Sequence, residues 1–162
     1  MIVVANAGPL IALAQIEHLH LLPQLFGNIK IPVAIENEVV SFKVDRPGAK
    51  AVNEAEWIQV ISVQNQAVVQ LLRERLDMGE SEAVALAIEL KADLLLIDEA
   101  RGRRVAETQG LNKAGTIGAL IMAKRLGFIQ SVRPLLDKLL VCGFRMDQKL
   151  YRHACQLAGE EA

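Results

Sequence analysis

The feature that most limits the possible folds is a set of short apolar runs, each followed by a segment with helical periodicity. The runs cover residues 2–5 and 94–97, and Ile29-Lys30-Ile31 predicts a further short strand. Runs of three or four apolar residues without alternation are typical of strands that are buried on both faces. Strands of this kind pair in parallel and need helical crossovers between them. The order of the segments therefore predicts an α/β fold.

The remaining pattern fills in the elements around these strands. Alternating apolar and polar residues predict a half-exposed edge strand over residues 57–63, and residues 111–113 predict a further short strand. Pro9 and Pro32 suit the first turns of helices. Residues 41–49 contain Pro47-Gly48 and predict a flexible loop, and residues 76–79 predict a break between two helices. Helices are expected at residues 10–14, 19–26, 33–40, 50–56, 67–75, 80–90, 101–109, 116–126, 132–141 and 147–157.

These elements predict a three-layer α/β/α sandwich around a small, twisted parallel sheet. With 162 residues, the chain is expected to be a single domain, with C-terminal helices over residues 131–158 packed on it. No stretch without charge exceeds the length of residues 1–16, which are interrupted by Asn6, Gly8 and Pro9 and are shorter than the ~20 residues of a membrane span. It also lacks the pattern of a signal peptide, so we expect a cytoplasmic protein without a membrane partner.

Charge and aromatic content narrow the function. The formal net charge is −1, with 18 basic and 19 acidic residues, which excludes a protein that coats nucleic acid by bulk positive charge. Aromatic residues make up 4% of the chain, which argues against a module that recognises nucleic acid by stacking on bases. A local basic patch remains compatible with both observations.

Polar side chains stand where the predicted strands end. Ligands of open parallel sheets bind at the carboxyl ends of the strands, and this rule selects residues there before any family is considered. The first strand ends at Asn6, and residues 94–97 are followed directly by Asp98 and Glu99. Two further pairs of acids lie near helix starts, namely Glu36 with Glu38, and Glu80 with Glu82.

Carboxylates that converge on one edge repel each other unless a hard cation neutralises them. Mg²⁺ and Mn²⁺ prefer oxygen ligands, and such a cluster suits hydrolysis of a phosphodiester. Each acid also has an ordinary structural interpretation. Glu80 and Glu82 are favourable at a helix N-terminus, Asp98 can cap the next helix, and Glu38 can be a surface residue. Spacing alone leaves both interpretations open.

An ordered set of motifs runs along the chain. The motifs are Val3-Val4-Ala5-Asn6-Ala7-Gly8-Pro9-Leu10-Ile11-Ala12-Leu13-Ala14, Ile31-Pro32 followed by Glu38-Val39, Leu76-Asp77-Met78-Gly79-Glu80-Ser81-Glu82-Ala83, Leu94-Leu95-Leu96-Ile97-Asp98-Glu99 followed by Gly102-Arg103-Arg104-Val105-Ala106, Gly115-Thr116-Ile117-Gly118, and Ala123-Lys124-Arg125-Leu126-Gly127-Phe128-Ile129. Each motif is weakly specific by itself, but the ordered set covers nearly the whole chain. Together the motifs resemble the PIN-domain family, and in particular a VapC-related subfamily of prokaryotic PIN-like proteins of unknown function.

The resemblance implies a ribonuclease that depends on Mg²⁺ or Mn²⁺ and acts on single-stranded RNA, with a small antitoxin protein as a partner. It implies catalytic roles for Asn6, Glu38, Glu80 or Glu82, and Asp98. The metal ligands would come from the acids alone, Glu38, Glu80, Glu82, Asp98 and Glu99. The choice between Glu80 and Glu82 stays open at this point.

The sequence departs from the catalytic pattern of the family at two positions. Asn6 stands where the family usually has its first aspartate, and Gly8 replaces the serine or threonine two residues later. Asparagine keeps an oxygen for a metal but lacks the negative charge, and Gly8 lacks a hydroxyl. The alternative function is therefore a catalytically weakened PIN-like module that binds nucleic acid or a protein.

A basic cluster follows the acidic residues and predicts the RNA contacts. Arg101, Arg103 and Arg104 place positive charge beside the expected site, where a phosphate backbone needs it, and Thr116 is expected to join them. The alternatives are an ordinary solvated helix face or a contact with an acidic partner segment. The apolar stripe of Leu135, Leu136, Leu139 and Leu140 is typical of a helix on a core, with a homodimer interface as the alternative.

Overall fold

The structure is a computed structural model that describes residues 1–41 and 49–161. Its strands are β1 (Val3–Ala5), β2 (Ile29–Ile31), β3 (Ile58–Val60), β4 (Leu94–Leu96) and β5 (Lys113–Ala114). Its helices are α1 (Ala7–Gln15), α2 (Leu21–Phe26), α3 (Val33–Ser41), α4 (Ala49–Asn53), α5 (Gln66–Leu72), α6 (Met78–Glu89), α7 (Ala100–Thr108), α8 (Thr116–Arg125), α9 (Arg133–Val141) and α10 (Gln148–Leu157).

The described strands form one parallel sheet in the order β3-β2-β1-β4-β5. Val3 pairs with Leu94 and Ala5 with Leu96, so β1 and β4 run in step and end at the same level. Because all strands are parallel, their carboxyl ends lie along one edge of the sheet. This register decides which residues can share a site.

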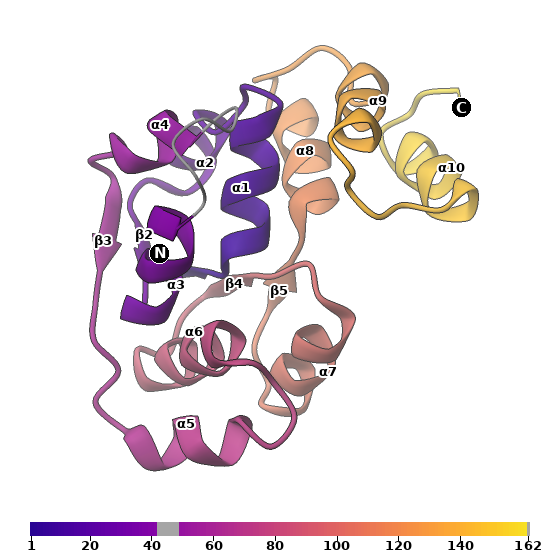
Figure 1. The fold of residues 1–162 in the computed structure, drawn as a ribbon. Coiled ribbons are helices and arrows are strands. Elements are labelled where there is room, and N and C mark those ends of the chain that lie inside the picture. Colours follow the sequence, from indigo (N-terminus) through magenta and orange to yellow (C-terminus); the bar gives the residue numbers. More distant parts are fainter. Residues whose placement is uncertain (42–48, 162) are drawn as a thin grey trace.

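Helices cover both faces of the sheet, which makes three layers (Figure 1). Helices α1 and α8 lie above strands β4 and β5 in that view, and α6 and α7 lie below them. The three residues of β1 have no exposed surface, because they are covered on both faces. The expected three-layer α/β/α fold is confirmed.

The C-terminal helices α9 and α10 lie beside α8, on the side away from α1 (Figure 1). Leu136 of α9 and Cys155 of α10 have no exposed surface and belong to the same cluster of buried residues as the strands. Burial of apolar surface, which contributes roughly 25 cal/mol per Å², holds these helices against the rest of the chain.

The local differences from the sequence prediction all concern element ends. Helix α1 begins at Ala7, so Pro9 is its third residue and not its first. The backbone N–H of a third residue still has no partner within the helix, and proline is therefore tolerated there. Residues 76–79 are not a simple break, because Asp77 caps α6 and the helix begins at Met78. Strand β3 covers less than the predicted residues 57–63, and β5 is displaced toward Ala114.

Two further predictions concern segments rather than ends. The predicted loop over residues 41–49 falls on positions 42–48, which lie outside the described residues. In the described part of the chain, no helix has the length and apolar character needed to cross a membrane.

Candidate active site

The register of the central strands brings Asn6, Asp98 and Thr116 to the carboxyl edge of the sheet. The backbone N–H of Asn6 donates to the carbonyl oxygen of Leu96 at 2.8 Å, which extends the pairing of β1 and β4 by one residue. The backbone N–H of Ile97 donates to the carbonyl oxygen of Ala114 at 2.9 Å, which does the same for β4 and β5. The Asn6 side chain is 7% exposed at this edge.

Asp98 is held in one orientation by Thr116. The backbone N–H of Thr116 donates to Asp98 Oδ1 at 2.7 Å, and Thr116 Oγ1 donates to Oδ2 at 2.7 Å. Thr116 has no exposed surface, so both donors are committed to the carboxylate. Thr116 thus positions Asp98, and its predicted contact with RNA stays a prediction.

The charge state of Asp98 is a balance between burial and its neighbours. Burial raises the pKa of Asp98, and the two hydrogen bonds from Thr116 offset part of the rise. The guanidinium of Arg103 lowers this pKa further, while the carboxylate of Glu99 raises it. Arg103 Nη1 donates to the carbonyl oxygen of Ile97 at 3.1 Å, which fixes the guanidinium beside the site.

Glu80 lies in the first turn of α6 and forms a capping box with Asp77. The backbone N–H of Glu80 donates to Asp77 Oδ1 at 2.8 Å, and Glu80 Oε1 accepts from the backbone N–H of Asp77 at 3.5 Å. Burial raises the pKa of Glu80 to about 7, and the charges of Asp77 and Glu99 act in the same direction. The carboxyl group of Glu80 therefore loses its proton at a higher pH than an ordinary glutamate does.

Glu38, in α3, approaches the same turn of α6 from the other side. Its carboxylate lies against Gly79, and the pKa of Glu38 is raised by burial and by the charge of Asp77. The electrostatic contacts thus link the acids in a row: Asp98 to Glu99, Glu99 to Glu80, and both Glu80 and Glu38 to Asp77.

Glycines provide the space that these carboxylates occupy. A Cβ atom at Gly79 would overlap Glu38 Oε1, and one at Gly102 would lie 3.0 Å from Glu80 Oε2. A Cβ at Gly115 would lie 2.6 Å from Asp98 Oδ1, and one at Gly8 would lie 3.2 Å from Asp98 Oδ2. Contacts this short force a neighbour to move, so larger residues at Gly79 and Gly115 would displace an acid of the site.

Gly8 illustrates how the departure from the family pattern is accommodated. A Cβ atom at this position would lie 3.2 Å from Asp98 Oδ2, so a serine or threonine would require a small shift of this carboxylate. The hydroxyl of Thr116 already donates to the same oxygen. Asp98 Oδ2 therefore has a hydroxyl donor although Gly8 has none.

Two of the other predicted residues bond away from Asp98. Glu82 Oε1 accepts from the backbone N–H of Ala34 at 3.0 Å, so its carboxylate caps the start of α3. Arg101 Nη1 donates to the carbonyl oxygen of Arg75 at 3.3 Å, on the side of α7 that faces the segment before α6. Arg104 is exposed and lines the same cavity as Asp98.

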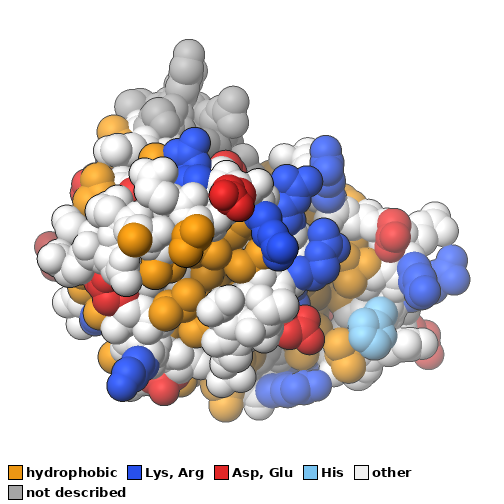
Figure 2. Space-filling view, turned by 90° about the horizontal axis from the view of Figure 1, so that it is seen from below, with side chains coloured by type: hydrophobic (Ala, Val, Ile, Leu, Met, Phe, Trp, Pro, Cys, Tyr) orange, Lys and Arg blue, Asp and Glu red, His pale blue; other side chains and the backbone are white. Residues whose placement is uncertain are grey.

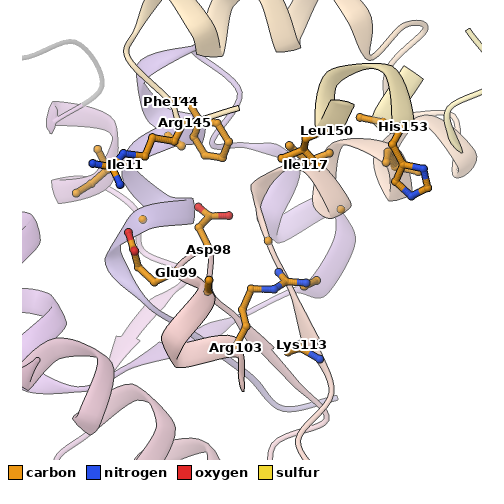
Figure 3. Close-up of a pocket in the computed structure, with 18 of the residues that line it drawn as sticks. Ile11, Asp98, Glu99, Arg103, Lys113, Ile117, Phe144, Arg145, Leu150 and His153 are labelled. Atoms are coloured by element: carbon orange, nitrogen blue, oxygen red, sulfur yellow. The ribbon is translucent and has the colours of Figure 1, made fainter. Parts of the chain in front are cut away.

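A cleft of about 1320 Å³ opens beside Asp98 and runs toward the C-terminal helices. Asp98 and Glu99 project into it, Phe144 lies across from them, and Arg103 and Lys113 lie on the side of α7 and β5 (Figure 3). Figure 2 shows basic side chains gathered next to acidic ones on this side of the molecule. The cleft therefore combines negative groups at the sheet edge with positive groups along its wall.

Sequence reasoning missed several residues of this region. Asp77 is hydrogen-bonded to Glu80 and interacts electrostatically with Glu38, and the spacing Asp77-x-x-Glu80 is typical of a capping box. Lys113, Arg145 and His153 line the cleft but come from three different elements or loops. No local sequence signal marks them.

The comparisons with known proteins now decide the family. A family model described as a PIN domain matches residues 2–160. The chain belongs to the PIN-domain family. No match was found among curated proteins. PIN domains act on nucleic acids in nuclease-type functions and generally use divalent metal ions.

The acids of this PIN domain fit a divalent cation by their chemistry. All are hard oxygen donors, and glycines clear the space around three of them. Among the described residues, no three His, Cys, Asp or Glu side chains come close enough together to form a ready metal site. Mg²⁺ usually keeps several waters and binds through one or two carboxylates, so an open arrangement of this kind is compatible with it.

Proposed function

We propose that this PIN domain is a divalent-metal-dependent endoribonuclease that cuts single-stranded RNA at the edge formed by Asp98, Glu99 and Glu80. We propose further that it is the toxin component of a toxin–antitoxin pair, with a small antitoxin protein as its partner. Support for the chemistry comes from the row of carboxylates, and support for RNA comes from the basic wall of the cleft.

The observation that carries this proposal is the fixed orientation of Asp98. Its carboxylate is held by two hydrogen bonds of 2.7 Å, one to each oxygen, while it faces a large cleft. A carboxylate that only capped α7 would bond to the first turn of that helix, but Asp98 is bonded to Thr116 of α8. Held in this way, Asp98 keeps remaining lone pairs directed at whatever enters the cleft.

The roles of the other residues follow from their positions. Asp98 and Glu80 would hold the cation, with Glu99 between them and with Mg²⁺ or Mn²⁺ as its identity. Such a cation supplies an acidified water and neutralises charge on the phosphate. Glu38 would add negative charge from α3, and Asn6 would contribute an amide oxygen or orient water. We assign the third acid to Glu80 and not Glu82, because Glu82 is bonded to the start of α3.

Arg103 would bind a phosphate group of the RNA. Its guanidinium is fixed beside Asp98 by the Ile97 carbonyl, within the wall of the cleft. Guanidinium groups bind phosphate oxygens in a forked geometry and stabilise the charge that develops on them.

The decisive experiment compares the parent protein with Asp98→Asn on a labelled single-stranded RNA in the presence of Mn²⁺. We expect cleavage by the parent protein and its loss in Asp98→Asn, because the amide removes the charge that faces the cleft. Asp137→Asn, an exposed acid on α9, is the matched control and should cut like the parent. Equal cleavage by Asp98→Asn and the parent would reject the assignment.

A second candidate function is a module that binds RNA or a protein without cutting. It is favoured by Asn6, which lacks the charge of an aspartate at the centre of the edge. Calorimetry with Mn²⁺ separates the two functions. A binding-only module should gain metal affinity sharply in Asn6→Asp, whereas binding of Mn²⁺ by the unchanged protein at micromolar concentration would remove the support for this candidate.

A further inference from the structure

A second, smaller hollow lies next to the proposed active site, on the other side of α7. It has a volume of about 540 Å³ and is lined by Glu74, Arg75, Arg101, Arg104, Val105 and Thr108. Three arginines thus converge on one hollow, and a single carboxylate accompanies them. The three positive charges repel one another, and an anionic ligand bound between them would remove this unfavourable electrostatic energy.

The three guanidinium groups are available to a ligand. No ion pair joins Arg75, Arg101 or Arg104 to a carboxylate among the described residues. Arg101 donates to the backbone carbonyl of Arg75 at 3.3 Å, which ties the start of α7 to the segment before α6. That bond holds two of the three arginine-bearing segments next to each other.

Helix periodicity explains how α7 serves two sites. Residues 101, 104, 105 and 108 lie at intervals of three and four, so they share one face of α7, and this face lines the small hollow. Residues 100, 103, 104 and 107 form the adjacent face, which lines the cleft that contains Asp98. Arg104 belongs to both faces and therefore stands between the two cavities.

We propose that the hollow is a phosphate-binding subsite for the RNA backbone, one that holds a neighbouring phosphate while the scissile phosphate lies near Asp98. The proposal rests on the proposed function for the substrate, and it adds Arg75 to the RNA contacts. A ligand that spans both cavities past Arg104 must carry repeated negative charges, which is what a phosphodiester chain has. The forked geometry of arginine matches phosphate oxygens.

The test measures RNA binding without cleavage. Full-length protein carrying Asp98→Asn is titrated with a fluorescein-labelled oligouridylate in EDTA, and fluorescence anisotropy is followed at several salt concentrations. Adding Arg75→Gln should weaken binding about threefold to tenfold and lower the slope of log affinity against log salt by about 1. Adding Glu74→Gln should change affinity in the opposite direction, because it removes the one opposing charge.

The matched control is Arg73→Gln, two residues away. Arg73 Nη1 contacts Met78 Sδ at 3.4 Å, and Arg73 is not among the residues that line the hollow. Its loss changes net charge by the same amount as Arg75→Gln but should leave binding close to that of the parent. Equal weakening by both variants would show a bulk charge effect and overturn the subsite, as would no weakening by Arg75→Gln. Circular dichroism verifies that each variant is folded.

Two competitors identify the ligand chemistry. An unlabelled oligouridylate should displace the labelled RNA in an Arg75-dependent way. Displacement by uridine monophosphate at an equal concentration would assign the hollow to a free phosphate group. Arg75-dependent binding of polyglutamate, with RNA binding unaffected by Arg75→Gln, would assign it to an acidic protein segment. Either result would overturn the backbone subsite.

Failure of this inference and failure of the proposed function can be told apart. Equal cleavage by Asp98→Asn and the parent would reject the proposed function alone, because the binding assay contains no divalent metal and does not depend on the reaction. If Asp98→Asn abolishes cleavage but RNA binding does not depend on Arg75, the proposed function is supported and the subsite is rejected.

Discussion

At the scale of single residues, the site is a row of carboxylates that the fold partly buries, and this burial has an energetic cost. Burial raises the pKa of Glu38, Glu80 and Asp98 alike. A raised carboxyl pKa means that the folded state favours the protonated form more than the unfolded state does. Functional sites commonly carry groups shifted in this way.

This cost predicts how stability depends on pH. The pKa of Glu80 is about 7 in the folded protein, against 4.5 for a glutamate exposed to water, so the unfolded chain loses its proton first as pH rises. Below pH 4.5 both states are protonated and Glu80 costs nothing. Between pH 4.5 and about 7 the free energy of unfolding should fall, and above that range the full cost is present.

Urea unfolding at a series of pH values in EDTA measures this effect. Glu80→Gln should lose less stability across the same range than the parent protein, because glutamine cannot ionise yet can still accept the hydrogen bond from Asp77. A variant that loses as much stability with rising pH as the parent would contradict the prediction.

At the scale of elements, the packing of α3 against α6 decides where Glu38 and Glu82 lie. Gly79, the second residue of α6, permits the close approach of the Glu38 carboxylate. One turn later Glu82 accepts from the backbone of Ala34 and ties the start of α3 to α6. The carboxylate of Glu82 thus joins the two helices, and their packing places the carboxylate of Glu38, a candidate functional group, near the edge of the sheet.

Gly79→Ala should destabilise the protein by about 1–3 kcal/mol, because its Cβ would overlap Glu38 Oε1 and lie 3.0 Å from Ile35 Cδ1. The matched change is Gly118→Ala in α8, where the nearest atom to a Cβ is 3.7 Å away, and it should be neutral or stabilise by up to about 1 kcal/mol. Urea unfolding of both variants gives the comparison.

A double variant identifies the group that Gly79 accommodates. If the clash is with Glu38, then Glu38→Ala should restore part of the stability that Gly79→Ala removes, and the two effects should not add. Additive losses would show that the overlap is relieved elsewhere.

At the scale of the whole molecule, a carboxylate near the C-terminus joins the last two helices to the rest. Glu160 accepts from Lys124 Nζ at 2.9 Å and from the backbone N–H groups of Val132 and Arg133 at 2.7 and 3.1 Å. Burial would raise the pKa of Glu160, but the Lys124 ammonium and the two backbone donors outweigh it and lower the pKa. We propose from this link and the shared core that residues 1–162 form a single domain.

A single domain predicts one cooperative unfolding transition. Trp57 fluorescence reports on the sheet edge near β3, and far-UV circular dichroism reports on all helices, so their urea transitions should coincide. Glu160→Gln should shift both transitions together by about 1–2 kcal/mol at neutral pH, because hydrogen bonds to a charged group are lost.

The contribution of Glu160 to the free energy of unfolding depends on pH in the opposite direction to that of Glu80. Because the folded pKa of Glu160 is lowered, its contribution is present above the unfolded pKa and is lost as pH falls through the folded pKa. The difference between Glu160→Gln and the parent should therefore narrow in acid. Glu161→Gln is the matched control and should unfold like the parent. Separate transitions for the two probes would argue for two domains.

Much of the fold and part of the site could be predicted because they depend on local patterns. Short apolar runs predict buried parallel strands, and the edge rule for such sheets selects Asn6 and Asp98 without knowledge of any contact. The cap of α6 was also readable from the spacing of Asp77 and Glu80, although the segment was interpreted as a break. Errors at the ends of α1 and β5 arose because propensities specify element type better than element boundaries.

The sequence by itself determined that Asn6 and Asp98 would lie at one edge of a parallel sheet, because strand burial and chain direction follow from periodicity. Only the tertiary structure decided that Thr116 holds Asp98, that Glu80 and not Glu82 turns toward Glu99, and that Arg75 joins Arg101. These outcomes depend on how helices rotate and pack against one another over long separations in sequence. Such packing is set by the whole core at once, and no local pattern encodes it.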